Sequence, residues 1–280
     1  MRIDLHSHST ASDGTEAPGE VVRLARVAGL DVLALTDHDT VAGLAPAAER
    51  LPAGLTLVPG MELSCRREGL SVHLLAYLFD PGDAALAAEC ELIRESRDSR
   101  GRRMVERLVE LGVPITWEQV TELAGGAAVG RPHIARAMVA AGVIDDPAQA
   151  FTADWLAPGG RAYQRRYAPD PATAVRMVRA AGGVPVLAHP GAGRRGQVVT
   201  DEWIAELAEA GLFGLEVDHA DHDPATRARL RDLAAALDLA VTGSSDDHGD
   251  LTGHRLGSET TSTEVYERLL GEATGAKPLT

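Results

Sequence analysis

The 280-residue sequence has few cysteines, no long apolar run and a deficit of positive charge. Its two cysteines, Cys65 and Cys90, are too few for a disulfide framework and form no Cys-x-x-Cys motif, so we expect both to be small buried hydrophobic residues. No run of about 18 apolar residues occurs, so no membrane span is expected. The net charge of -14 argues against a surface that binds duplex DNA, because such binding relies on clustered cations.

The amino terminus leads directly from Met1 into a strand pattern flanked by polar residues. It lacks the basic and apolar blocks of a secretory signal, so a cytoplasmic location is expected. At 280 residues and 45% hydrophobic composition, the chain has the length of one closed barrel of about 250 residues plus an insertion.

Seven apolar segments have the length and composition of buried strands. They occupy residues 3–8, 31–36, 55–58, 72–78, 184–188, 213–217 and 239–243. Amphipathic segments with helix start and stop signals lie between several of them, at residues 18–28, 171–181 and 224–237. This alternation predicts an α/β fold of parallel β/α units closed into a barrel, in which reactive groups lie at the carboxyl ends of the strands.

From residue 81 to residue 169 the strand pattern lapses and a helical pattern replaces it. Apolar residues there follow three- and four-residue spacing, at Leu86, Cys90, Ile93, Met104, Leu108 and Leu111. The pattern predicts a helical cap at 81–169, inserted between a first barrel part at 1–80 and a second at 170–280. Most arginines of the cap alternate with acidic residues, which is typical of a solvated helix face with ion pairs.

Side chains that bind metals recur where the predicted strands stop. They are His6, His8, Asp13, His38, Glu62, His73, His189, Asp246 and His248. Six of the seven strands have candidate ligands at their carboxyl ends, counting Asp218 and His219 after 213–217, whereas His73 lies near the start of its strand. A lone His-x-His pair such as His6 and His8 indicates little, but the repetition predicts one shared metal site.

The types of donor restrict the metal and the chemistry. All nine are nitrogen or oxygen donors, which favours Mn, Fe or Zn as cofactor, and nine groups suit two or three divalent ions. Clustered cations can lower the pKa of a bridging water from ~15.7 toward ~7, which supplies hydroxide at neutral pH without a protein nucleophile.

Two further segments are candidates for substrate binding. Arg131 and His133 follow Gly130 at the expected start of a helix over 134–141, where a guanidinium group suits an anionic oxygen ligand. An ordinary helix-entry turn with a surface arginine explains this segment equally well. His222 is the third candidate phosphate contact, and an exposed loop histidine is its alternative explanation.

Taken together, these motifs resemble the polymerase and histidinol phosphatase (PHP) family of phosphoesterases, within the wider amidohydrolase group. The resemblance rests on Asp-Leu-His-Ser-His-Ser at 4–9, Thr-Asp-His-Asp at 36–39, Gly-Met-Glu-Leu-Ser at 60–64, Val-His-Leu-Leu at 72–75, Ala-His-Pro at 188–190 and Ser-Asp-Asp-His at 245–248. It spans the whole chain and implies a distorted, TIM-like (β/α)7 barrel that holds up to three divalent ions.

By this resemblance the nine donors divide into three groups. The groups are His6, His8 and Asp246 for one ion, His73 and His189 for a second that Glu62 bridges to the first, and Asp13, His38 and His248 for a third.

Two positions depart from the family pattern, because Asp247 replaces a common aromatic residue and Asp218 replaces a common tyrosine before His219. Both departures imply a more acidic substrate pocket.

The segment at 130–133 and the insertion look like the branch of the family that hydrolyses small nucleotide phosphomonoesters. A 3',5'-bisphosphate nucleotide phosphatase is therefore the leading expectation. A 5'-3' exoribonuclease that acts on the 5' end of a short RNA, or a 5'-nucleotidase, is the closest alternative.

Two other functions are disfavoured. Histidinol phosphatases commonly have histidine where Asp13 stands. A non-catalytic regulatory module that binds metal is disfavoured because every expected ligand position retains a competent ligand.

Overall fold

The computed structural model describes residues 1–124, 129–193 and 197–280. It consists of two compact units, one formed by Met1–Cys90 with Pro169–Thr280 and the other by Glu91–Ala168. The first unit is built on a sheet and the second is helical. No helix within the described residues is both long and apolar enough to cross a membrane.

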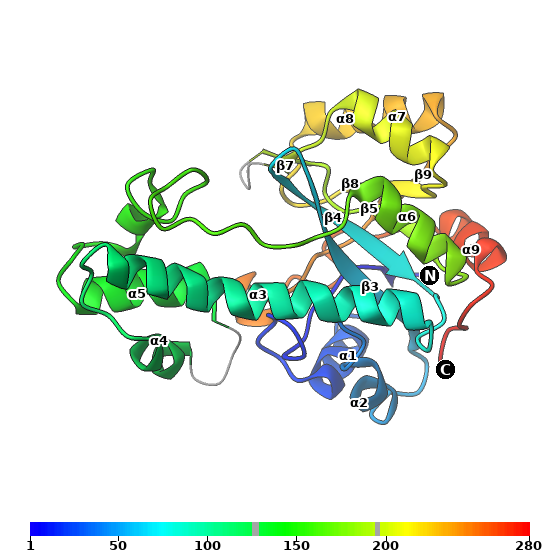
Figure 1. The fold of residues 1–280 in the computed structure, drawn as a ribbon. Helices are drawn as coiled ribbons and strands as arrows, with labels where there is room; N and C mark the ends of the chain where they lie inside the picture. The colour runs from blue at the N-terminus through cyan, green and yellow to red at the C-terminus, as the bar shows by residue number, and fades with distance from the viewer. Residues whose placement is uncertain (125–128, 194–196) are drawn as a thin grey trace. The chain divides into compact units, whose positions relative to one another are not determined.

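A seven-stranded sheet forms the centre of the first unit, in the order β1-β2-β3-β4-β5-β8-β9 (Figure 1). The strands are β1 (Ile3–Asp4), β2 (Val32–Leu35), β3 (Thr56–Arg67), β4 (Leu70–Tyr77), β5 (Val184–Leu187), β8 (Gly214–Asp218) and β9 (Ala240–Gly243). A parallel bridge between Ser7 and Asp247 joins the segments that follow β1 and β9, so the sheet is nearly closed. The predicted seven-stranded α/β barrel is confirmed.

Helices precede or follow the strands, and those that begin at Pro18, Pro171 and Pro224 start where the sequence signals predict. They are α1 (Pro18–Val27), α2 (Leu44–Ala48), α6 (Pro171–Ala180), α7 (Asp201–Glu209), α8 (Pro224–Ala236) and α9 (Thr263–Glu272). Asp170 and Asp223 cap α6 and α8 by accepting hydrogen bonds from backbone N–H groups of the first helical turn. A short hairpin of β6 (Gly191–Ala192) and β7 (Gln197–Val198) follows β5.

Strand β4 contradicts the prediction of an all-parallel arrangement. It is antiparallel to β3 and to β5, and it follows β3 after a tight turn at Glu68 and Gly69, whose φ angles are 51° and 89°. Because β4 runs in the opposite direction, its start lies at the sheet edge where the parallel strands end. This reversal explains why His73, near the start of its strand, lies with the other donors.

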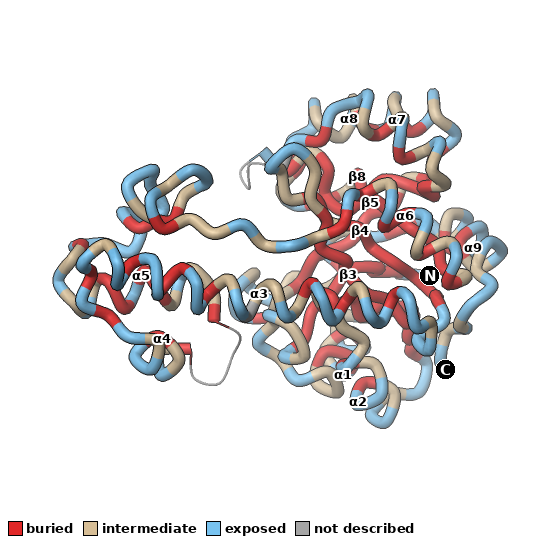
Figure 2. The backbone as a smooth tube through the Cα atoms, viewed as in Figure 1, coloured by how far each residue is buried: buried red, intermediate tan, exposed pale blue. Residues whose placement is uncertain are grey.

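Apolar side chains of the strands and helices pack into buried clusters around the sheet. Ile3, Val186 and Phe213 belong to one buried cluster around the sheet, and α1 contributes Val21 and Val22 to another. Figure 2 shows the strands as almost continuously buried. Each such side chain contributes about 1.5–3 kcal/mol on burial. The nine donors lie outside these clusters, either after strands or, for Glu62 and His73, within β3 and β4.

The second unit contains most of the long helix α3 (Ala84–Glu110), with α4 (Trp117–Ala124), α5 (Arg131–Ala140) and the 3-10 helix η1 (Pro147–Phe151). Its buried core includes Met104, Leu108, Ile134, Met138 and Leu156. The unit lies within the range predicted for the helical insertion.

Three arginines on one face of α3 have a structural role that the predicted solvated face did not include. Arg100, Arg103 and Arg107 donate hydrogen bonds of 2.8, 3.4 and 3.3 Å to backbone carbonyls of residues 161–165. They therefore tie the helix to the extended segment that follows η1.

Candidate metal centre

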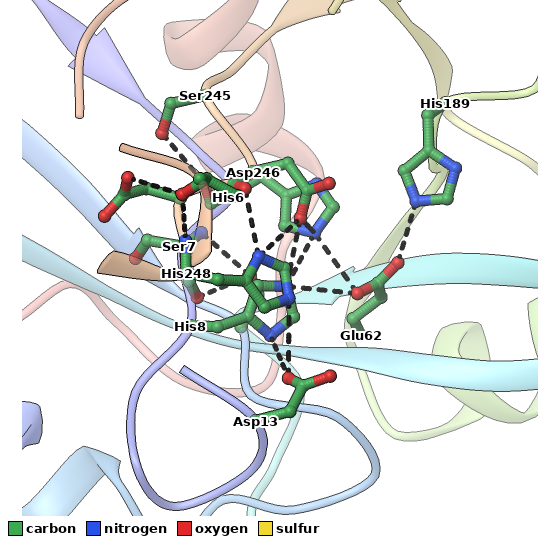
Figure 3. A network of polar contacts seen from close by, with 12 residues as sticks. His6, Ser7, His8, Asp13, Glu62, His189, Ser245, Asp246 and His248 are labelled. Atoms are coloured by element: carbon green, nitrogen blue, oxygen red, sulfur yellow. Dashed lines mark hydrogen bonds and ion pairs between the residues drawn. The ribbon is translucent and has the colours of Figure 1, made fainter. Parts of the chain in front are cut away.

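The structure brings all nine predicted donors to one edge of the sheet. They follow β1 (His6, His8, Asp13) and β2 (His38), lie in β3 (Glu62) and β4 (His73), and follow β5 (His189) and β9 (Asp246, His248). Figure 3 shows seven of them around a common centre. Residues from both halves of the sequence therefore meet at one site.

Five imidazoles surround the carboxylate of Glu62. Oε2 lies 3.2 Å from each of three ring nitrogens, those of His6, His8 and His38. Oε1 lies 2.8 Å from His73 Nδ1 and 3.1 Å from His189 Nε2. Each oxygen thus faces a different set of histidines, which is the geometry expected of a carboxylate that bridges two cations.

The spacing of His6, His8 and Asp246 fits a metal ion. The Nε2 atoms of the two histidines lie 3.0 Å apart, and each lies 3.3 Å from Asp246 Oδ1. Ligands bound at 2.0–2.2 Å and at right angles to one another are ~3 Å apart. Together with Glu62, these atoms all lie within 4.8 Å of one another. The donors therefore match what a divalent ion requires.

A second group contains Asp13, His38 and His248. Asp13 Oδ1 lies 3.4 Å from His248 Nε2, and Asp13 Oδ2 lies 3.7 Å from His38 Nε2. His8 also belongs to this group, and His38 also groups with Glu62 and His73. Eight of the nine donors thus form overlapping sets rather than separate ones, and His189 joins them through Glu62.

Burial and nearby carboxylates compete at the histidines of the centre, and the pKa values of His8 and His38 shift in opposite directions. Burial disfavours the charged form of His8, but hydrogen bonds to Asp246 and Glu62 outweigh burial and raise its pKa to about 10. For His38 burial dominates, and its pKa falls to about 4. Burial also opposes ionisation of Glu62 and Asp246, yet the surrounding imidazoles hold both pKa values well below the usual range.

The second oxygen of Asp246 is held away from the histidine pair. Oδ2 lies 3.3 Å from His219 Nε2 and 3.5 Å from the Arg255 guanidinium group, which also donates to the backbone carbonyl of Asp246. Asp246 has a φ of 50°, a left-handed conformation that is costly for a residue other than glycine. These contacts fix a strained backbone and leave Oδ1 directed at His6 and His8.

The carboxylates at the two departing positions have hydrogen-bond or ion-pair partners, and the predicted acidity of the substrate pocket stays a prediction. The carboxylate of Asp247 accepts hydrogen bonds from the backbone N–H groups of Gly249 and Arg255. Asp218 pairs with Arg227 and Arg231 on α8. Both carboxylates are therefore occupied by loop and helix groups.

The predicted substrate contacts have partners of their own. His222 Nδ1 bonds to the carbonyl of Val217 and Nε2 accepts from Gly191 N–H, so a phosphate contact would require one bond to open. In the second unit, His133 Nδ1 accepts from Gly130 N–H at the start of α5. The Arg131 guanidinium lies 5.6 Å from the centroid of the Phe151 ring. Their roles in substrate binding stay predictions.

Sequence reasoning missed one buried acid of the site, Glu216 on β8. Its side chain is fully buried, and it bonds to His6 Nδ1 at 2.9 Å. Burial opposes its ionisation, but His6 outweighs burial and lowers the pKa of Glu216 to about 2. The sequence signal was a single carboxylate between Leu215 and Val217 in an otherwise apolar strand. By the two-residue period of a strand, the Glu216 side chain points to the face opposite the one that Leu215 and Val217 share.

The chain is similar to several known proteins along most of its length. The sequence pattern of the PHP domain family matches residues 4–114. Phosphoribosyl 1,2-cyclic phosphate 1,2-diphosphodiesterase of Eggerthella lenta is 35% identical over 255 residues, which cover 89% of this chain and 95% of that protein. A 5'-3' exoribonuclease of Haemophilus influenzae is 32% identical over 252 residues, covering 88% and 90%.

A third relative and a solved structure extend these similarities. The 3',5'-nucleoside bisphosphate phosphatase of Chromobacterium violaceum is 33% identical over 260 residues, which cover 90% of this chain and 89% of that protein. A crystal structure from Bifidobacterium adolescentis, whose proposed identity is a metal-dependent phosphoesterase, shares 38% identity. The two structures superpose with a TM-score of 0.82 over 97% and 96% of their chains.

Proposed function

On the premise that this chain belongs to the PHP domain family of metal-dependent phosphoesterases, we propose that it removes phosphate from a nucleotide. Membership of the family makes it a hydrolase of phosphate esters. The proposed substrate is a 3',5'-bisphosphate nucleotide. The observation that carries the proposal is the cluster of nine donors that includes Glu62, together with the likeness to the phosphatase of Chromobacterium violaceum.

The donor cluster suits two or three divalent ions of Mn, Fe or Zn. Bound ions would supply positive charge for the phosphoryl oxygens and a water of lowered pKa. Glu62 holds two sets of imidazoles around one carboxylate, and Asp246 keeps one oxygen directed at His6 and His8. These residues thereby hold the donors in a fixed arrangement before substrate binds.

We propose Arg131, His133 and His222 as contacts for substrate phosphate. A guanidinium group binds phosphate through two parallel hydrogen bonds, which suits Arg131 to the second phosphate of a bisphosphate nucleotide. Arg131→Ala is expected to raise KM for the bisphosphate more than KM for a nucleoside monophosphate. Equal changes for both substrates would remove Arg131 from the proposal.

The substrate proposal is tested with purified protein loaded with Mn²⁺. Release of phosphate is measured from a 3',5'-bisphosphate nucleotide, a nucleoside monophosphate and histidinol phosphate. Ring opening of a ribose cyclic phosphate is followed by phosphorus NMR, because hydrolysis of one of its two ester bonds frees no phosphate. We expect the highest kcat/KM for the bisphosphate. A higher value for another ester would replace the proposed substrate, and no release from any ester would contradict the activity.

A 5'-3' exoribonuclease is a second candidate, favoured by the likeness to the enzyme of Haemophilus influenzae. The two candidates differ in the length of the nucleotide chain they accept. Turnover of a bisphosphate mononucleotide and of a 5'-phosphorylated RNA oligonucleotide is therefore compared at equal concentration. Faster release of mononucleotides from the RNA would favour the exoribonuclease.

A further inference from the structure

We propose that Glu216 is a positioning residue that fixes two ligands of the metal centre, His6 and His189, through one buried carboxylate. The inference rests on the proposed function only in taking those histidines as metal ligands. Glu216 lies on β8, is fully buried and is not one of the nine predicted donors.

The first contact sets which nitrogen His6 offers to a metal. His6 Nδ1 lies 2.9 Å from Glu216 Oε1, and an ionised carboxylate can only accept, so Nδ1 carries the proton of this bond. The other ring nitrogen, Nε2, faces Glu62 Oε2 at 3.2 Å and Asp246 Oδ1 at 3.3 Å. Glu216 thus holds both the tautomer and the ring direction that the centre needs.

The second contact acts on the backbone of His189. The N–H of His189 donates to Glu216 Oε2 at 2.8 Å. His189 has a φ of 29°, a left-handed conformation that residues other than glycine rarely adopt. The hydrogen bond helps to hold this conformation, which carries His189 Nε2 to 3.1 Å from Glu62.

A third donor completes the surroundings of the carboxylate. The hydroxyl group of Ser244, which follows β9, hydrogen-bonds to Glu216 Oε1. Glu216 therefore joins groups that follow β1, β5 and β9. All three partners donate, so an acceptor-only side chain fits and an amide does not, since its NH₂ group would face one of the donors.

The test compares Mn²⁺ binding by wild type, Glu216→Gln and the control Asp218→Asn. The control also neutralises a carboxylate on β8, but one that pairs with Arg227 and Arg231. Metal-free protein is titrated with Mn²⁺ against a chelator of known affinity, and the ions bound per chain are counted by elemental analysis. We expect Glu216→Gln to bind the ions whose ligands include His6 and His189 about 10- to 100-fold less tightly than wild type, and Asp218→Asn to bind them like wild type.

Turnover at increasing Mn²⁺ separates positioning from general destabilisation. Glu216→Gln is expected to recover activity at high Mn²⁺, which a misfolded variant would not do. Glu216→Asp is the second variant, because it keeps the charge but withdraws the carboxylate by one methylene. It is also expected to weaken Mn²⁺ binding.

Wild-type affinity in both Glu216 variants would overturn the inference. Wild type that binds Mn²⁺ but hydrolyses no nucleotide would contradict the proposed function alone. Wild type that binds no Mn²⁺ would contradict both.

Discussion

Asp13 Oδ1 lies 3.4 Å from His248 Nε2, and the Asp13 side chain is 52% exposed, whereas the His248 side chain is 13% exposed. The other seven donors are at most 14% exposed. Any ion bound by Asp13 is therefore closer to water than an ion bound by His6 and Asp246. The centre should accordingly hold its ions with unequal strength.

We predict that Asp13→Ala lowers the metal content by one ion per chain and leaves the others bound. Asp13 is the only carboxylate of its group, so its loss removes the charge that attracts the outer cation. Elemental analysis after extensive dialysis measures the loss. Asp232→Ala, which removes an exposed carboxylate on α8, is the control. Unchanged metal content in Asp13→Ala would refute the assignment.

Glu62→Gln should impair the whole centre. The substitution removes the charge that faces five imidazoles and replaces one accepting oxygen by a donating amide group. We expect the affinity for Mn²⁺ to fall at least tenfold at more than one of the metal-binding sites, and turnover to fall in parallel. Calorimetric titration of the metal-free variant measures this, and loss of a single ion would show that Glu62 does not bridge.

Metal affinity should increase with pH. Without metal the pKa of His8 is raised to about 10, so near neutral pH a metal ion must displace a proton from His8. Each displaced proton makes the apparent affinity rise about tenfold per pH unit until the pH reaches the pKa of the group that loses it. His6 adds a second proton, because Glu216, Asp246 and Glu62 outweigh burial and raise its pKa well above the usual value. His38, whose pKa is about 4, is already neutral in this range and adds nothing. Apparent dissociation constants for Mn²⁺ at pH 6.5, 7.5 and 8.5 test the trend, which a flat profile would contradict.

Tyr77→Phe should destabilise the barrel without affecting the metal centre. The hydroxyl group of Tyr77 is buried and donates to the Leu5 carbonyl at 2.8 Å, which links β4 to the segment after β1. Losing this bond is expected to lower the free energy of unfolding by about 0.5–1.5 kcal/mol. Urea unfolding measures the change, with the exposed Tyr167→Phe as control. A change in Mn²⁺ affinity would mean that the hydroxyl group also supports the site.

Much of the fold followed from local sequence, because buried strands and helix starts have strong local signals. The prolines that open α1, α6 and α8 marked helix starts correctly. The direction of β4 did not follow, because its apolar pattern is the same whether the strand runs parallel or antiparallel. The tight turn at Glu68 and Gly69 is the sequence feature that reverses the chain before β4. It spans only two residues and is a weaker signal than the apolar pattern of the seven strands.

The positions of the nine donors were predictable because strand ends of one barrel converge. Their grouping was not, since the overlap of sets at His8 and His38 depends on ring orientation. Glu216 was missed because a single acid inside a strand has no distinctive spacing. The partners of Asp218 and Asp247 were not predicted, because the direction of a side chain at a strand end or in a loop does not follow from sequence spacing.

The bridge between Ser7 and Asp247 has a consequence for biosynthesis. A ribosome that has released His6, Glu62 and His73 has not yet made Asp246, so the nascent chain holds His6 without one of the buried carboxylates that contact it. The set of donors that includes Asp246 is therefore complete only after translation through β9. A product truncated before that strand would be unable to assemble the site, whatever the supply of metal in the cell.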